Sequence, residues 1–177
     1  MDDELRNLAE AIDRKCRLQG EFILRSGITA TEYFDKYLFE SDPALLRRVV
    51  ELMIPLVPAD TDLLGGLELG GVPLATVLSQ VTGIPTVFVR KEAKKYGTRR
   101  LAEGADTARK HVTLVEDVIT TGGAVRDATI ALREQNAHVA HVVCAIDRST
   151  DGAAALTGLG VSIRSVLTKD ILDSTLR

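Results

Sequence analysis

The sequence predicts an α/β fold with a mostly parallel central sheet flanked by helices. From residue 63 onward, short apolar strand-like runs alternate with segments of helical periodicity. Strands that alternate with helices are joined by right-handed crossovers and pair in parallel. The chain has 177 residues, with 45% hydrophobic and 27% charged residues, which is typical of one globular domain. We therefore expect a single domain over residues 1–177.

The first 40 residues are expected to form an N-terminal helix and a small hood. Apolar residues at helical spacing predict a helix over 3–18, and Gly20 is a plausible stop. Two strand-like runs follow, at 21–25 and 32–37. They read as a small β-hairpin with an aromatic face.

The remaining elements follow in order along the chain. Asp42-Pro43 opens a second helix, because proline in the first turn loses no needed hydrogen bond, and Pro55 and Pro58 end it. After it we expect a strand from Leu63 into Gly65-Gly66, a helix over 72–81, strands over 85–90 and 111–116, a helix over 122–135, a strand over 138–147, a short helix over 151–157, a strand over 161–166 and a final turn capped by Thr168.

Composition excludes several classes of function. The formal net charge of −3 argues against a nucleic-acid binder, and no apolar run is long enough for a membrane span. The acidic start, Met1 to Glu4, lacks the layout of a signal peptide. Cys16 and Cys144 have no metal-ligand spacing and read as reduced thiols. We expect a cytoplasmic protein that binds neither nucleic acid nor membrane.

The segment from Val112 to Ala124 is the most informative part of the chain. An apolar strand ends in Glu116-Asp117, and a turn of small residues then leads into a helix. Backbone N–H groups at such a helix start lack partners and favour a phosphate. Two carboxylates cannot favour phosphate, so they need another ligand, such as sugar hydroxyls or a metal ion. The combination suggests a sugar phosphate.

A basic segment lies between two of the predicted strands. Residues 90–100 contain six basic residues and one acidic residue, within a polar stretch over 91–110. Such a run is often only a solvated face, but long loops inside compact domains are frequently lids. A cationic lid suits a leaving group with several negative charges. We therefore expect 91–110 to be a mobile catalytic loop.

Two further motifs stand at predicted strand ends. The glycine-rich run 65–71 is either a tight turn or a second anion cradle made of backbone N–H groups. Asp147-Arg148 follows an apolar strand and is either a surface salt bridge or a site in which the arginine grips a carboxylate.

These motifs together resemble a known family. The acid pair with its turn is similar to the phosphoribosyl diphosphate (PRPP) signature of type I phosphoribosyltransferases. The order of the hood motif Phe22 to Gly27, Tyr33-Phe34-Asp35, the glycine-rich turn, the Arg90 to Gly97 run and Asp147-Arg148 resembles the orotate phosphoribosyltransferases. The resemblance covers residues 20–170.

The resemblance implies a reaction and a set of site residues. Orotate and PRPP, with Mg²⁺ as cofactor, would give orotidine 5′-monophosphate and diphosphate, in de novo UMP synthesis. The implied catalytic residues are Lys94, Glu116 and Asp117. PRPP binding is implied for Arg25, Arg90, Lys91, Lys94, Tyr96, Glu116, Asp117, Val118, Ile119, Thr120, Thr121, Gly122, Gly123 and Ala124; a diphosphate turn for Glu68, Leu69 and Gly70; and orotate binding for Thr120, Arg148 and Phe34.

The resemblance also implies how the metal and the partner subunit take part. Mg²⁺ would be held mainly by PRPP rather than by protein ligands. The lid would serve the active site of the partner subunit, which implies a homodimer with shared active sites. Three positions depart from the usual family pattern: Arg25 stands where lysine is usual, Tyr96 where some members have histidine, and Glu68-Leu69 where some relatives have a lysine for diphosphate.

Two alternative functions remain open from the sequence alone. One is a phosphoribosyltransferase for another nucleobase, which would share the sugar-phosphate site. The other is a non-catalytic PRPP-sensing regulator on the same fold. Arg148 and the hood favour orotate, and the lysines of the basic segment favour catalysis over regulation.

Overall fold

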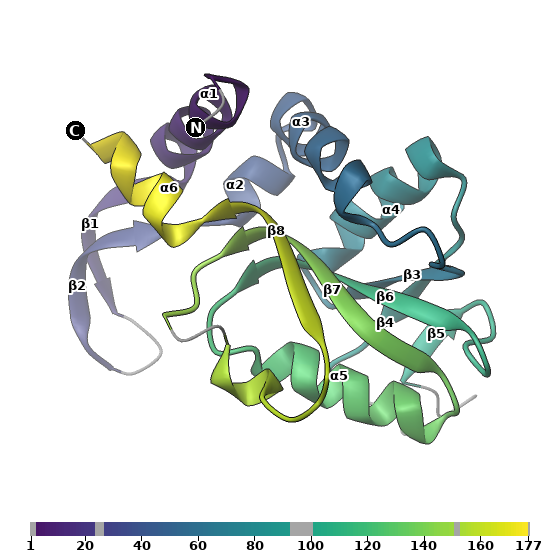
Figure 1. The fold of residues 1–177 in the computed structure, drawn as a ribbon. Helices are drawn as coiled ribbons and strands as arrows, with labels where there is room; N and C mark the ends of the chain where they lie inside the picture. Colours follow the sequence, from purple (N-terminus) through teal and green to yellow (C-terminus); the bar gives the residue numbers. More distant parts are fainter. Residues whose placement is uncertain (1–2, 24–26, 93–100, 151–152, 177) are drawn as a thin grey trace.

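A six-stranded sheet forms the centre of the protein (Figure 1). The computed structural model describes residues 3–23, 27–92, 101–150 and 153–176. In spatial order the strands are β5 (Ala102–Gly104), β4 (Thr86–Val89), β3 (Leu63–Leu67), β6 (His111–Ile119), β7 (His138–Asp147) and β8 (Ser162–Thr168). Each neighbouring pair is parallel except β4 and β5, which pair antiparallel. The predicted mostly parallel sheet is therefore confirmed.

Helices cover both faces of this sheet. Figure 1 shows α1 (Asp3–Cys16), α3 (Pro43–Met53) and α4 (Gly71–Thr82) on one face and α5 (Gly123–Glu134) on the other. Two groups of buried apolar side chains lie between these layers, one beneath the three helices and one beneath α5. Short elements complete the described chain: α2 (Tyr37–Glu40), α6 (Lys169–Asp173) and the 3₁₀ turns η1 (Ile54–Leu56), η2 (Ala154–Leu156) and η3 (Ser174–Leu176).

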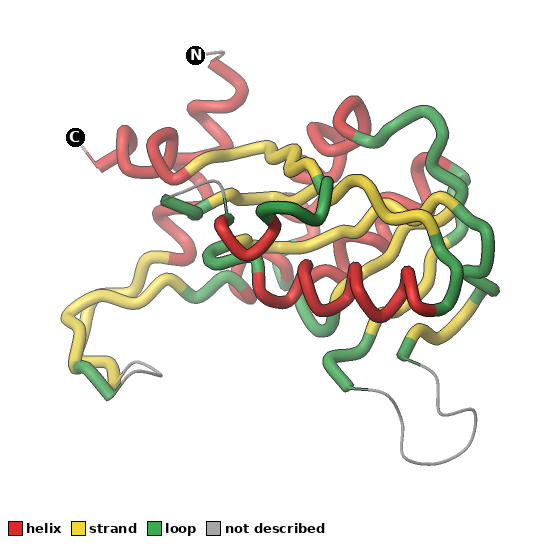
Figure 2. The backbone as a smooth tube through the Cα atoms, turned by 60° about the horizontal axis from the view of Figure 1, so that its bottom comes forward, coloured by secondary structure: helices red, strands yellow, loops and turns green. Residues whose placement is uncertain are grey.

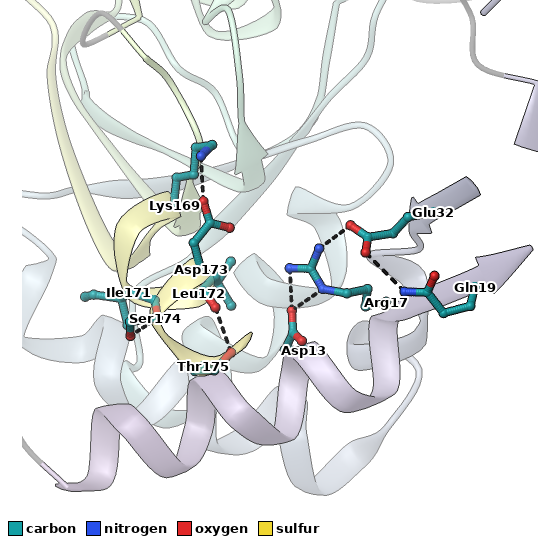
Figure 3. A network of polar contacts seen from close by, with 10 residues as sticks. All are labelled: Asp13, Arg17, Gln19, Glu32, Lys169, Ile171, Leu172, Asp173, Ser174 and Thr175. Atoms are coloured by element: carbon teal, nitrogen blue, oxygen red, sulfur yellow. Dashed lines mark hydrogen bonds and ion pairs between the residues drawn. The ribbon is translucent and has the colours of Figure 1, made fainter. Parts of the chain in front are cut away.

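The predicted hood is a two-stranded antiparallel sheet that projects from the body (Figure 2). It consists of β1 (Arg17–Ile23) and β2 (Thr29–Phe34). Arg17 ties it to α1, because its guanidinium contacts Asp13 Oδ1 at 2.7–2.8 Å and also pairs with Glu32 of β2 (Figure 3). These contacts fix the direction in which the hairpin leaves the first helix.

Three sequence-based boundaries were wrong in informative ways. The run 32–37 is not all strand: β2 ends at Phe34, and Asp35 Oδ1 accepts the N–H of Tyr37 at 3.1 Å, which starts the unpredicted helix α2. The expected loop 91–110 includes strand β5, which pairs with β4. In place of the expected helix over 151–157, the described residues form only the turn η2.

The order of the strands creates one crevice at the centre of the sheet. The chain leaves β3 through α4 toward β4, and leaves β6 through α5 toward β7, so the two halves wind in opposite directions. In open parallel sheets, ligands bind at the carboxyl ends of the strands where the winding reverses. Here that point lies between the ends of β3 and β6, where the glycine-rich turn and the acid pair meet.

No helix within the described ranges is long and apolar enough to cross a bilayer.

The start of α3 gives a test of the local fold. Asp42 Oδ1 accepts the N–H groups of Ala44 and Leu45 at 3.0 and 3.1 Å, and Oδ2 pairs with Lys15 of α1 at 2.5 Å. We expect Asp42→Ala to lower the urea concentration at the midpoint of unfolding, because both the cap and the ion pair are lost. Asp42→Asn keeps the capping oxygen and should recover most of that loss. Equal midpoints for the alanine variant and the wild type would contradict this account of the cap.

Candidate functional site

A cavity of about 320 Å³ opens at the central crevice. It lies where α2, the β3–α4 turn and the β6–α5 turn meet. Its lining combines two cations, two carboxylates and a run of small residues: Lys36, Tyr37, Glu68, Leu69, Lys91, Glu116, Val118, Ile119, Thr120, Thr121, Gly122, Gly123, Ala124 and Val125. The structure therefore brings the predicted acid and phosphate-turn residues into one cavity with part of the predicted diphosphate turn.

The turn after β6 has the geometry of an anion site. Gly122 precedes α5 with φ at 77°, a left-handed conformation that favours glycine. A side chain there would also lie 2.9 Å from the Cβ of Ala153. The first N–H groups of α5 have no partner inside the helix, and they carry the positive end of its dipole. This geometry is compatible with a phosphate bound against the backbone of residues 120–124.

The two acids of β6 have different surroundings. Glu116 lines the cavity, whereas Asp117 is fully buried and does not. The sequence led us to expect both carboxylates beside a sugar, and the structure places only Glu116 on the cavity wall. Burial raises the pKa of Glu116 well above its usual value, and the negative charge of Asp117 raises it further.

Lys36 is a residue of the site that the sequence analysis missed. It precedes α2 and lines the cavity, and its Nζ lies 2.6 Å from Asp117 Oδ2. Burial alone would lower the pKa of Lys36, but the hydrogen bond and charge of Asp117 outweigh burial and raise it. The available signal was a lysine directly after the aromatic hood strand, but a single charged residue is normally read as exposed.

The turn from β3 to α4 reaches the acids through glycine. A Cβ on Gly70 would lie 1.6 Å from Asp117 Oδ2, and one on Gly71 would lie 2.1 Å from the carbonyl oxygen of Val115. Gly65 and Gly66 have another role, because they lie inside β3 and are buried against Leu114 and α4. Of the predicted diphosphate turn, Glu68 and Leu69 line the cavity, and the N–H of Glu68 donates to Val89 O at 2.8 Å.

The basic segment begins at the rim of this cavity. Glu68 Oε2 accepts the N–H of Lys91 at 3.0 Å, and the N–H of Arg90 donates to Leu101 O at 2.9 Å. Glu68, which stands where some relatives have a lysine, thus holds the start of the basic segment in place. A second cavity, of about 700 Å³, is lined by Arg90 and shares Glu68, Lys91 and part of the phosphate turn with the first. The predicted residues Arg25, Lys94 and Tyr96 lie outside the described residues.

Phe34 and Arg148 lie together beside the crevice. The guanidinium carbon of Arg148 is 5.2 Å from the centre of the Phe34 ring, and its backbone N–H donates to Ile119 O at 2.8 Å. Asp147 accepts hydrogen bonds from the backbone and hydroxyl groups of Ser149 at 2.9 and 2.7 Å. The backbone of Arg148 is thus held next to Ile119, the residue before Thr120.

Comparison with known proteins identifies the family. Residues 42–156 match the model of the phosphoribosyl transferase domain family. An orotate phosphoribosyltransferase of Nocardioides sp. is 64% identical over 167 residues, which cover 94% of this chain and 93% of that protein. The chain belongs to the orotate phosphoribosyltransferase family. The resemblance inferred from the sequence motifs is therefore confirmed.

Solved orotate phosphoribosyltransferases share the whole fold. The Mycobacterium tuberculosis enzyme, crystallised with Fe(III) dicitrate, superposes with a TM-score of 0.83 at 34% identity, covering 96% of this chain and 98% of that one. A structure of the same enzyme with PRPP gives a TM-score of 0.80 at 29% identity, covering 96% and 99%. The hood, which precedes the residues matched by the family model, is within the extent of these superpositions.

The contact at Gly70 gives a direct test of this geometry. We expect Gly70→Ala to lower the free energy of unfolding by about 3 kcal/mol or more, because Asp117 has no room to move away from the new methyl group. Chemical denaturation measures the loss. Gly20→Ala is the control, since its Cβ would meet only the edge of the Phe22 ring, at 3.2 Å. Similar stability of the two variants would show that Gly70 and Asp117 are not in close contact.

Proposed function

We propose that this protein transfers the 5-phosphoribosyl group of PRPP to orotate, giving orotidine 5′-monophosphate and diphosphate in de novo pyrimidine synthesis. One observation carries the proposal. A backbone phosphate site, a carboxylate and a pair of cations, Lys36 and Lys91, line one cavity beside an arginine that can bind a carboxylate. These groups match the separate parts of PRPP and the carboxylate of orotate, and family membership supports the pairing.

Each part of the site has a defined role in this reaction. Residues 120–124 bind the 5′-phosphate, and Glu116 accepts hydrogen bonds from the ribose hydroxyls. As the bond from the anomeric carbon to diphosphate breaks, positive charge develops on the sugar ring. That charge favours the ionised form of Glu116, and the negative charge of the acid pair in turn stabilises it. The bond from the orotate nitrogen then forms at the same carbon.

Basic side chains bind the diphosphate leaving group in this reaction. Lys91 lines both cavities, Arg90 lines the second one, and Glu68 and Leu69 of the glycine-rich turn line the first. Lys36 adds a positive charge to the lining of the first cavity, which offsets the missing lysine of the glycine-rich turn. Lys94 and Tyr96 are proposed to complete the lid, and Arg25 to contact PRPP from the hood, by family resemblance.

Mg²⁺ is proposed as the cofactor, bound mainly through PRPP. Among the described residues there is no group of three or more histidine, cysteine, aspartate or glutamate side chains that could hold a metal ion. By family resemblance, Mg²⁺ would be held mainly by PRPP. When bound there, it supplies neutralising charge for the departing diphosphate.

We also propose a cytoplasmic homodimer whose lid reaches the partner's active site. The support is the family resemblance, together with the two buried cysteines and the acidic overall charge. The same charge supports the proposal that nucleic acid and membranes are not partners.

A substrate panel tests the proposed function. Diphosphate release from PRPP and Mg²⁺ is measured with orotate, uracil, adenine or xanthine as acceptor. We expect release with orotate only. Release with another base and none with orotate would assign the protein to a different phosphoribosyltransferase. PRPP binding without release for any base would favour a regulator.

Arg148 should determine the affinity for the acceptor. A charge-assisted hydrogen bond contributes about 1.5–3 kcal/mol, so we expect Arg148→Ala to raise the KM for orotate about 10- to 100-fold. The KM for PRPP should change much less. Arg47→Ala is the matched control, because Arg47 forms an exposed pair with Glu51 on α3. An unchanged KM for orotate in the Arg148 variant would remove this residue from the acceptor site.

A further inference from the structure

Behind the cavity wall, ionisable groups from two elements converge on Gly70. Glu40 is the last residue of α2 and is only 7% exposed, and Asp117 of β6 is fully buried. A Cβ on Gly70 would lie 1.6 Å from Asp117 Oδ2 and 2.9 Å from Glu40 Oε1. The oxygens of the two carboxyl groups therefore flank the same small space.

Glu40 and Asp117 cannot complete their hydrogen bonds if both carboxyl groups are ionised. Asp117 Oδ1 accepts the N–H of Val118 at 2.5 Å, and Oδ2 forms the ion pair with Lys36. Among the described residues, Glu40 Oε1 is buried with no hydrogen-bond donor, and Oδ2 has no hydrogen bond beyond that ion pair. Two carboxylates can only accept, so both oxygens are satisfied only if one carboxyl carries a proton.

Burial identifies the group that holds this proton. It raises the pKa of Glu40 to about 9, and the hydrogen bond and charge of Asp117 act in the same direction. Three charged or titratable groups face Glu40: Asp117 and Glu116 from β6, and Lys36 at the start of α2. Only Lys36 favours ionisation of Glu40, and its ammonium is already paired with Asp117. At neutral pH Glu40 is therefore a carboxylic acid that can donate to Asp117.

We propose that Glu40 is a positioning residue for phosphoribosyl transfer, which holds the Asp117 carboxylate beside the sugar site through a carboxyl–carboxylate hydrogen bond. The role rests on the proposed function. When the phosphates of PRPP attract Lys36, Asp117 loses part of its ion pair. The Glu40 hydroxyl group remains as a donor that keeps Asp117 in place behind Glu116.

Two substitutions distinguish the effect of the hydrogen bond to Asp117 from the effect of Glu40 ionisation. The amide of Glu40→Gln donates to Asp117 at every pH, whereas Glu40→Ala has no donor. Glu51→Gln removes a carboxylate of the same type from an exposed pair with Arg47 and serves as the matched control. The readouts are kcat/KM for PRPP with orotate from pH 6 to 10, and the free energy of unfolding over a wider range from pH 4.

At neutral pH we expect the glutamine variant to keep activity within about threefold of the wild type. The alanine variant should lose about tenfold or more, the cost of a missing charge-assisted hydrogen bond. As the pH approaches 9, Glu40 of the wild type ionises, loses its donor and repels Asp117. The wild type and the Glu51→Gln control should then lose activity that Glu40→Gln retains.

The pH dependence of the free energy of unfolding should also report the ionisation of Glu40. The pKa of Glu40 is higher in the folded than in the unfolded chain, so its contribution to stability is complete below about pH 4.5 and falls as the pH rises through about 9. Glu40→Gln should lessen this fall, whereas Glu51→Gln should not.

Defined results would overturn the proposal. Wild-type activity and an unchanged pH profile in Glu40→Ala would limit Glu40 to a structural role or none. If the alanine variant does not fold, the glutamine variant decides. A loss of kcat/KM at alkaline pH that is identical in Glu40→Gln and in the wild type would also limit Glu40 to a structural role or none. If the wild type itself has no activity with PRPP and orotate, the proposed function and the positioning role fail together.

Discussion

The close approach of the β3–α4 turn to the end of β6 is the constraint on which the site depends. Gly71 lies so near the Val115 carbonyl group that a Cβ would be 2.1 Å from its oxygen, and Gly70 lies as close to Asp117. Any side chain at either position would push the turn away from the acids. The approach joins the two halves of the sheet at their carboxyl ends, where one crevice can bind both ends of an extended substrate.

The same approach brings several carboxyl groups close to a site for anions. Hydrogen bonding, ion pairing and protonation of these carboxyl groups reduce the repulsion. A site for a polyanion contains Glu68, Glu116 and, behind the wall, Asp117 and Glu40. Glu68 is occupied by the backbone of Lys91, Asp117 is paired with Lys36, and burial favours the neutral form of Glu40. Few unpaired negative charges therefore remain to repel phosphate, while Glu116 still lines the cavity in which the sugar is proposed to bind.

The sequence predicted the parts of the site that depend on local patterns. An apolar strand followed by Thr-Thr-Gly-Gly predicted the phosphate turn, and the strand 138–147 has the bounds that were expected. The roles of Lys36 and Glu40 depend on contacts between α2 and β6, which are distant in sequence. No periodicity signals such a pair, and both residues are of types that are usually exposed.

The burial of Asp117 escaped prediction for a related reason. Adjacent acids at a strand end look equivalent in the sequence, but their environments are set by Gly70 and Lys36, which the fold brings in from elsewhere. The hood was predicted as a hairpin, yet its second strand was extended to Tyr37, the first residue of the unpredicted helix α2, because aromatic residues favour strands. Local chemistry was thus readable from the sequence, whereas the electrostatic balance of the site required the structure.

The most direct test of the account is a crystal structure of the protein with PRPP bound. We predict the 5′-phosphate on the backbone N–H groups of residues 120–124, the ribose hydroxyls within hydrogen-bond distance of Glu116, and the diphosphate against the turn from Glu68 to Gly70. A PRPP molecule bound away from the β6–α5 turn, for example at the cavity bounded by Arg109 and Arg133 near the amino ends of β6 and β7, would contradict the assignment of this crevice as the active site.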